Sequence, residues 1–398
     1  MDIRIDFSGR AIRYTEEEIA AVVAAMRDAD PLTQGGRQIA FQEKFKKFNG
    51  AEYAFAFMNG TAALQTAAEL CLLNQGDEVV IPSHTFTSSA YPFAARGAGL
   101  IFADIDPHTR VTTAEHIERV LTPRTRVVVV VHLYGFVADM PPIMELAKKR
   151  GLAVVEDACQ AIGAEHAGVK AGNFADFGTF SFHSHKNITT LGEGGMLTLK
   201  DARRAEAVPM LRHNGHRAYA GNRPNYWIPA MGDLDFPELD GRRLQPANYC
   251  IGEVECALGS VLLDRVQTIN AQKRERAIRF IDELADRPEL IFHREAGPRH
   301  NYHLLAARME GPTSRRDAFM RRMYGEFGIK CVVQYYPLNR YPYYQKLGFG
   351  QADCPNADAF FDHMISFPFQ HGLTETQLEY MLDCTRKTLD GLRSGQGA

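Results

Sequence analysis

The stretch FGTFSFHSHKNITTLGEGG, residues 177–195, carries one lysine between a short apolar run and a glycine cluster. We predict a strand over 177–182, because apolar and aromatic residues dominate it. Lys186 follows this strand directly, among two histidines, one glutamate and several glycines. Its position raises the question of whether Lys186 is an ordinary surface charge or a reactive amine.

A second segment, LAVVEDACQA at 152–161, ends an apolar strand on Asp157. Ligands of open α/β sheets bind outside the carboxyl ends of the strands, so Asp157 is expected to face a crevice. Aspartate also caps helices readily, and for Asp157 taken alone this structural role is equally well supported. The interval between Asp157 and Lys186 leaves room for one crossover and the strand at 177–182. The two side chains are therefore able to meet across one pocket.

The wider sequence alternates strand and helix signals, with strands predicted at 78–84, 100–106, 126–135 and 152–158. Near-continuous valine and isoleucine runs of this kind favour an α/β fold with a parallel or mixed sheet between helices. A long amphipathic helix is predicted over 257–285, followed by helices and short strands at 301–309 and 329–337. We therefore predict a large domain over residues 1–265 and a smaller C-terminal α+β domain over 266–398.

Composition is that of an ordinary globular protein. Of the 398 residues 45% are hydrophobic and 23% charged, and the net charge is -3. This balance gives no reason to expect binding to nucleic acid or to an anionic membrane. The N-terminal residues lack the apolar core of a signal peptide, and the seven cysteines lack CxxC spacing. We expect a cytoplasmic protein with reduced thiols.

A lysine and a carboxylate in one pocket suit pyridoxal 5'-phosphate. The acid would keep the pyridine ring protonated as an electron sink, and the amine would form a Schiff base. In MNGTAALQTA, residues 58–67, a Gly60-Thr61 turn begins a helix whose free N–H groups favour a phosphate. In PSHTFTSSA, residues 82–90, Phe86 offers a ring for stacking. Each feature is common in α/β proteins when taken alone, so the order of the features along the chain is the stronger evidence for this cofactor.

The sequence gives less support to other cofactor-binding, catalytic and metal-binding motifs. No G-x-G-x-x-G follows a strand, and neither a Walker A motif nor a G-x-S-x-G elbow occurs. His183 and His185 lack the further ligands that would complete a metal site, so no metal is expected. Five arginines near the long loop at 218–246 are candidates for a diphosphate or, more simply, solvated surface charges: Arg212, Arg217, Arg223, Arg242 and Arg243.

Six ordered motifs resemble the DegT/DnrJ family of sugar aminotransferases, which are fold-type I enzymes that use pyridoxal phosphate. They are NGTAAL, PSHTF, VEDACQAIGA, SFHSHKNITTLGEGG, NYCIGEVECALG and SFPFQHGLT. The resemblance extends from about residue 31 to the C-terminus. It implies a large domain with a mostly parallel, seven-stranded sheet sandwiched by helices, and a smaller C-terminal domain.

The resemblance also assigns site residues. It implies that Lys186 bonds covalently to the cofactor, that Asp157 pairs with the pyridine nitrogen and that Gln160 contacts the ring hydroxyl side. Phe86 would stack on the ring, and the phosphate would be held by Gly60, Thr61 and Ser181. In relatives an asparagine at the position of Asn248 reaches the phosphate from the neighbouring subunit. The implied active unit is therefore at least a homodimer with shared sites.

The implied reaction is transfer of the amino group of L-glutamate to a keto sugar, with pyridoxamine phosphate formed between the two half-reactions. The expected acceptor is a nucleotide-linked 3-keto or 4-keto deoxyhexose, and the product is an amino sugar for surface polysaccharides or secondary metabolites. A cyclitol or another non-nucleotide ketone is the main alternative acceptor. A sugar dehydratase is disfavoured because such relatives replace the lysine by histidine, and a non-catalytic binding or regulatory protein because the site residues are intact.

This sequence departs from the family pattern at four places. Cys250 stands where arginine is usual, Asn339 stands where histidine is common, and Leu191 is an apparent insertion. The loop at 218–246 is also longer than expected. If these features line the substrate side, they indicate an unusual acceptor.

Overall fold

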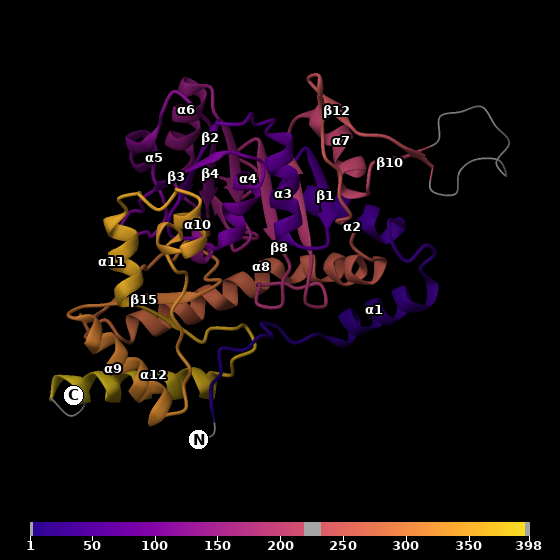
Figure 1. Ribbon diagram of the computed structural model, residues 1–398. Coiled ribbons are helices and arrows are strands. Elements are labelled where there is room, and N and C mark those ends of the chain that lie inside the picture. Colours follow the sequence, from indigo (N-terminus) through magenta and orange to yellow (C-terminus); the bar gives the residue numbers. More distant parts are fainter. Residues whose placement is uncertain (1–2, 219–231, 395–398) are drawn as a thin grey trace.

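The computed structural model describes residues 3–218 and 232–394. Its larger sheet has seven strands in the order β1-β9-β8-β5-β4-β2-β3 (Figure 1). Strands β8, β5, β4, β2 and β3 are mutually parallel, and β9 is antiparallel to both β8 and β1. The strands are β1 (Tyr53–Phe57), β2 (Glu78–Pro82), β3 (Gly99–Ala103), β4 (Thr125–Val131), β5 (Ala153–Asp157), β8 (Phe177–Ser181) and β9 (Gly195–Leu199). The predicted α/β fold with a mostly parallel sheet is confirmed.

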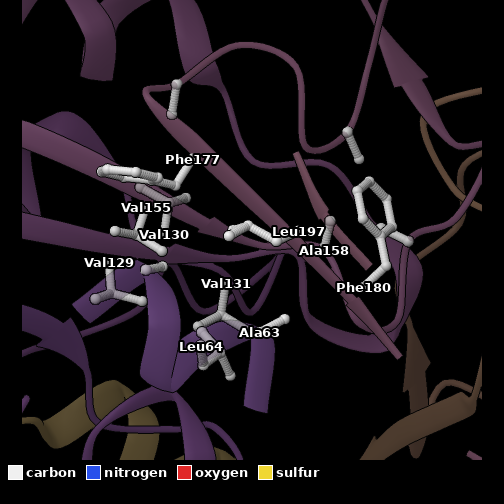
Figure 2. Close-up of a cluster of buried hydrophobic side chains, with 14 of the residues drawn as sticks. Ala63, Leu64, Val129, Val130, Val131, Val155, Ala158, Phe177, Phe180 and Leu197 are labelled. Carbon is white, nitrogen blue, oxygen red and sulfur yellow. The ribbon is translucent and has the colours of Figure 1, made fainter. Parts of the chain in front are cut away.

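Helices pack against this sheet along its whole width. They are α2 (Gly36–Asn49), α3 (Gly60–Leu70), α4 (Tyr91–Ala94), α5 (Ala114–Val120), α6 (Met140–Arg150) and α7 (Ala202–Arg212). Valines of β4 and β5 lie in the core with Ala63 and Leu64 of α3 (Figure 2). Burial of such continuous β-branched strands from both faces is the main stabilising contribution to a parallel sheet.

The C-terminal part contains a second, antiparallel sheet in the order β14-β15-β16. Its strands are β14 (Leu290–Phe292), β15 (Leu305–Met309) and β16 (Met364–Phe367). The helices of this part are α9 (Thr313–Gly325), α10 (Pro342–Lys346), α11 (Pro355–His363) and α12 (Glu375–Arg393). The predicted long helix is confirmed as α8 (Glu253–Asp282), which packs against α1 (Glu16–Asp28) and α2 (Figure 1).

The predicted strand at 329–337 is wrong. Only isolated bridges form there, between Ile5 and Ile329 and between Val332 and Ser366. The β-branched residues of this segment favour a strand by propensity, but Pro337 has no N–H to donate. After Val332 the chain leaves β16 and lines a cavity beside the larger sheet.

Two hydrophobic cores accompany the two sheets. Helix α8 contributes to both, with Ile269 in the larger core and Phe280 in the smaller one. The domain boundary near residue 265 stays a prediction, and residue 265 itself lies within this continuous helix.

The remaining elements are short. They are β6 (Glu165–His166), β7 (Val169–Lys170), β10 (His216–Arg217), β11 (Asp233–Leu234), β12 (Glu238–Leu239), β13 (Arg242–Arg243) and 3₁₀ helices at Thr87–Ser89, Leu133–Gly135 and Leu338–Arg340. Residues 219–231 of the long loop lie outside the described residues. Within the described ranges no helix combines the length and the apolar character needed to span a bilayer.

Candidate active site

A cavity of about 650 Å³ lies at the carboxyl ends of β5 and β8, next to the first turn of α3. Strand pairing places these ends together, because Asp157 of β5 is opposite Thr179 of β8. Seven of the eight residues predicted for the site line this one cavity: Gly60, Thr61, Phe86, Asp157, Gln160, Ser181 and Lys186. Asn248 does not.

Lys186 lies in the turn that follows β8, where its N–H donates to the carbonyl of His183 at 2.8 Å. Burial lowers the pKa of the Lys186 amine, while the neighbouring Cys159 and Asp157 act in the opposite direction. A lysine whose pKa is lowered spends more time as the neutral amine, which is the nucleophilic and basic form. Lys186 is therefore suited to bond with an aldehyde and to move protons.

Asp157 is the last residue of β5 and is only 6% exposed. One carboxylate oxygen accepts a hydrogen bond from the Ser89 hydroxyl at 2.6 Å, and the other accepts from the Cys159 N–H at 3.1 Å. No helix begins directly after Asp157, so the alternative role as a helix cap is wrong. Both donors are neutral, so a carboxylate at this buried position favours a cationic group in the cavity. A protonated pyridine nitrogen fits this requirement.

The first turn of α3 provides a fitting place for a phosphate. Asn59 caps the helix by accepting from the Ala62 N–H at 2.8 Å, whereas the N–H groups of Gly60 and Thr61 lack intrahelical acceptors. A Cβ added at Gly60 would lie 2.9 Å from Cβ of Ser181 and 3.0 Å from Sγ of Cys159. Only glycine lets this helix start lie so close to the end of β8. The donor set and the open cradle suit a phosphate.

Gln160 and Phe86 occupy the cavity wall in different ways. Both ends of the Gln160 amide are engaged, since Oε1 accepts from the Tyr134 N–H at 2.7 Å and Nε2 donates to the Tyr335 hydroxyl at 3.2 Å. Phe86 is 53% exposed and meets the Tyr335 ring edge-on at 6.2 Å. Stacking by Phe86 and ring contact by Gln160 stay predictions.

Fifteen further lining residues were not predicted as site residues, although His183 and His185 had been considered as metal ligands. They are Phe7, Asn59, Leu64, Thr85, Ser88, Cys159, His183, His185, Glu193, His303, Leu304, Val332, Val333, Gln334 and Tyr335. Asn59, Cys159 and Glu193 stand within motifs already singled out, so proximity in sequence was a usable signal. Phe7, His303 and Tyr335 come from distant segments, and no local pattern marks them.

The four departures from the family pattern lie away from this cavity or outside the described residues. Asn339 is buried, accepts from the Ser83 hydroxyl at 2.7 Å and donates to the carbonyl of Ala352 at 3.3 Å. Cys250 contacts the carbonyl of Arg212 through its sulfur, at 3.6 Å, and Leu191 is exposed. These three positions do not line the cavity of their own subunit, part of the long loop is not described, and the unusual acceptor stays a prediction.

The candidate diphosphate arginines are engaged elsewhere. Arg212 is buried and donates to the carbonyl of Ala56 at 2.7 Å. The other described ones contact Asp235 at 3.3 Å (Arg217), Asn74 at 2.9 Å (Arg242) and Glu238 at 3.5 Å (Arg243), and Arg223 lies outside the described residues. None of the four described arginines lines the cavity.

Comparisons with known proteins show which family this chain resembles. Residues 13–386 match the DegT/DnrJ/EryC1/StrS aminotransferase family. GDP-perosamine synthase from Caulobacter vibrioides is 32% identical over 365 residues, covering 89% of this chain and 91% of the relative. L-glutamine:2-deoxy-scyllo-inosose aminotransferase from Streptomyces paromomycinus is 34% identical over 306 residues, covering 75% and 70%. Spr1654 from Streptococcus pneumoniae in its PMP form has a TM-score of 0.86 at 25% identity, covering 96% of this chain and 99% of that structure.

The fold, the cavity and these likenesses define an aminotransferase that uses pyridoxal phosphate. More particularly, the chain belongs to the DegT/DnrJ/EryC1/StrS aminotransferase family. The resemblance of the six motifs is thereby confirmed.

Proposed function

We propose that this chain transfers the amino group of L-glutamate to the ketone carbon of a keto sugar, most simply a nucleotide-linked 3-keto or 4-keto deoxyhexose. The observation that carries the proposal is one cavity that contains Lys186, Asp157 and the first turn of α3. The product would be an amino sugar for a surface polysaccharide or a secondary metabolite. One relative is named a GDP-perosamine synthase and another an aminotransferase of 2-deoxy-scyllo-inosose, and both names support a hydroxylated cyclic acceptor.

Each site residue has a defined task in this proposal. Bound pyridoxal phosphate supplies an electron sink that weakens bonds at the substrate carbon attached to nitrogen. Asp157, fixed by Ser89, balances the positive charge of the ring nitrogen. The N–H groups of Gly60 and Thr61 and the Ser181 hydroxyl hold the phosphate. Nζ of Lys186 removes the α proton of the donor and returns a proton to the acceptor carbon.

A cyclitol ketone is the second candidate acceptor, and one observation favours it. Among the described residues that line the cavity, Lys186 alone is a lysine or arginine. A nucleotide diphosphate would therefore need cationic side chains from beyond this lining, whereas a cyclitol would need only hydrogen bonds. Competition by nucleoside diphosphates for the acceptor distinguishes the two, since only a nucleotide pocket would bind them.

We also propose a homodimer with shared sites and a cytoplasmic location. Asn248 is exposed on its own subunit and lies outside that subunit's cavity. An exposed position leaves its side chain available to a neighbouring subunit, as the family resemblance implies. The cytoplasmic location rests on composition and on the cysteine pattern, and cell fractionation tests it.

The experiment is an absorption titration of the purified protein with pyridoxal phosphate, followed by L-glutamate. We expect a visible band from the bound cofactor that glutamate bleaches and that an added keto sugar or cyclitol ketone restores. Lys186→Ala should lose or alter the band, whereas Lys387→Ala, an exposed lysine paired with Asp383 at 2.7 Å, should behave as wild type. A band that L-glutamate and L-glutamine both leave unchanged would refute the transaminase proposal, and a response to glutamine alone would correct the donor.

A further inference from the structure

Lys273 is a buried amine on α8 with an unusual set of partners. It is 3% exposed, and its Nζ donates to the carbonyl of Phe369 at 2.8 Å and to the carbonyl of His303 at 3.1 Å. Leu305 of β15 pairs with Phe367 of β16, so these two carbonyls belong to the segments just beyond that pair. Lys273 thus joins the ends of two neighbouring strands.

Within the described ranges, no carboxylate forms an ion pair with Lys273. Burial, and next the charge of Arg276, lowers the pKa of the Lys273 amine to about 7. An amine buried without a counter-ion is costly, and a methionine of similar length would fill the same space without that cost. The two carbonyl contacts therefore indicate a role beyond packing.

His303 connects Lys273 to the reaction cavity. The imidazole is 3% exposed and lines the cavity that contains Lys186. Its backbone is fixed on both sides, because its N–H donates to Oδ1 of Asn301 at 3.0 Å and its carbonyl accepts from Lys273. Asn301 is itself bound to the carbonyl of Gln160 at 3.0 Å. The backbone of His303 is thus tied, through Asn301, to Gln160 in the cavity wall.

The His303 ring is uncharged and has an unused hydrogen-bonding atom. Burial, and next the charges of Lys186 and Lys273, hold the pKa of His303 well below its usual value. Among the described residues none bonds its buried Nδ1. A buried polar atom without a partner is costly, and a bound group or a reorientation of the ring would satisfy it.

We propose that His303 is a further hydrogen-bonding residue of the reaction cavity and that Lys273 is the residue that positions it. This inference rests on the proposed function, since it takes Lys186 as the cofactor-binding lysine. The ring stands beside Lys186 as a neutral donor or acceptor for the bound cofactor. Lys273 acts on it from outside the cavity, through the main-chain carbonyl.

The test measures the dissociation constant of pyridoxal phosphate for wild type, Lys273→Met, His303→Leu and the double variant. Each single substitution should weaken binding about fivefold, the effect of losing one ordinary hydrogen bond. The double variant should bind no more weakly than His303→Leu, because Lys273 acts through His303. Lys387→Met, which changes an exposed lysine, should bind as wild type.

Two conservative variants separate positioning from simple stability. Lys273→Arg keeps the donors to both carbonyls, and His303→Gln keeps a neutral polar side chain. Both should restore affinity to within about twofold of wild type. If Lys273→Met does not fold, the comparison of His303→Leu with His303→Gln still tests the role of the His303 ring, and Lys273→Arg still tests the role of Lys273.

The outcomes are distinguishable. Wild-type affinity in Lys273→Met and His303→Leu, with only the melting temperature lowered, would overturn this inference and leave the proposed function intact. Multiplying effects in the double variant would also overturn the positioning role. A wild-type protein that binds no pyridoxal phosphate would overturn the proposed function together with this inference.

Discussion

Ser89 is a hydrogen-bond partner of Asp157, although the two residues lie in different segments of the chain. Both side chains are buried, and the Ser89 hydroxyl donates to the carboxylate at 2.6 Å. Removal of a hydrogen bond to a buried charged group costs about 1–3 kcal/mol. We expect Ser89→Ala to weaken binding of pyridoxal phosphate about tenfold or more, because Asp157 would be less well oriented toward the ring nitrogen.

Absorption titration of Ser89→Ala measures this effect. Ser394→Ala, a change at the C-terminal end of α12, is the control. Equal affinities in the two variants would show that Asp157 does not depend on Ser89.

Single residues with special chemistry were the most predictable part of the site. Lys186, Asp157 and Gly60 were identified because each has a residue type and a position at an element end that the proposed chemistry requires. Ser89, His303 and Tyr335 were not identified, because serine, histidine and tyrosine occur in many roles. Long-range packing places His303 and Tyr335 at the cavity and leaves no local signature, whereas Ser89 stands in the same motif as Phe86.

Among the secondary-structure elements, the glycine cluster after Lys186 illustrates what a sequence pattern leaves out. Its last glycine, Gly195, begins β9, and a Cβ there would lie 2.4 Å from the carbonyl atoms of Asn59 and 2.7 Å from the nitrogen of Gly60. Glycine is therefore required for β9 to lie against the start of α3. The sequence showed only a cluster of glycines, and this close approach depends on the pairing of β9 with β1 and β8.

Helix α2 shows a second limit of local prediction. Its own N-cap residue, Gly35, has no side chain to cap it. The carboxylate of Glu253, at the start of α8, accepts hydrogen bonds from the N–H groups of Gly35, Arg37 and Gln38 at 2.9, 2.7 and 3.1 Å. Capping across such a distance in sequence follows from tertiary packing. The incorrect strand at 329–337 has the same origin, since propensity there is overridden by the path of the chain into the cavity.

At the scale of the whole molecule, the reaction cavity lies between the larger sheet and segments that adjoin the smaller one. Apolar periodicity predicted the α/β class, the positions of the parallel strands along the sequence and the long helix. The sequence did not predict that residues around 303 and 335 line a cavity at the larger sheet, because no local pattern links these segments to Asp157. The apolar lining residues nevertheless pack with the larger core: Leu64 and Leu304 belong to it, and Phe7, Val333 and Tyr335 pack against it.

At the scale of the assembly, the shared-site proposal predicts complementation between two inactive chains. Lys186→Ala and Asn248→Ala chains should each bind or use the cofactor poorly alone. Random mixed dimers should regain about a quarter of the wild-type sites, since half of the dimers are mixed and each has one intact site. Absorption of coexpressed chains measures this recovery. No gain over either variant would contradict a contribution of Asn248 across the subunit interface.

The central claim is that Lys186 is the residue to which pyridoxal phosphate bonds. Its most direct test is borohydride reduction of the protein loaded with pyridoxal phosphate, followed by proteolysis and mass spectrometry of the peptides. The account predicts that the cofactor becomes permanently attached to the peptide containing Lys186, and that prior addition of an effective amino donor prevents the attachment. Attachment to another lysine, or none to Lys186 under conditions where the cofactor is bound, would contradict it.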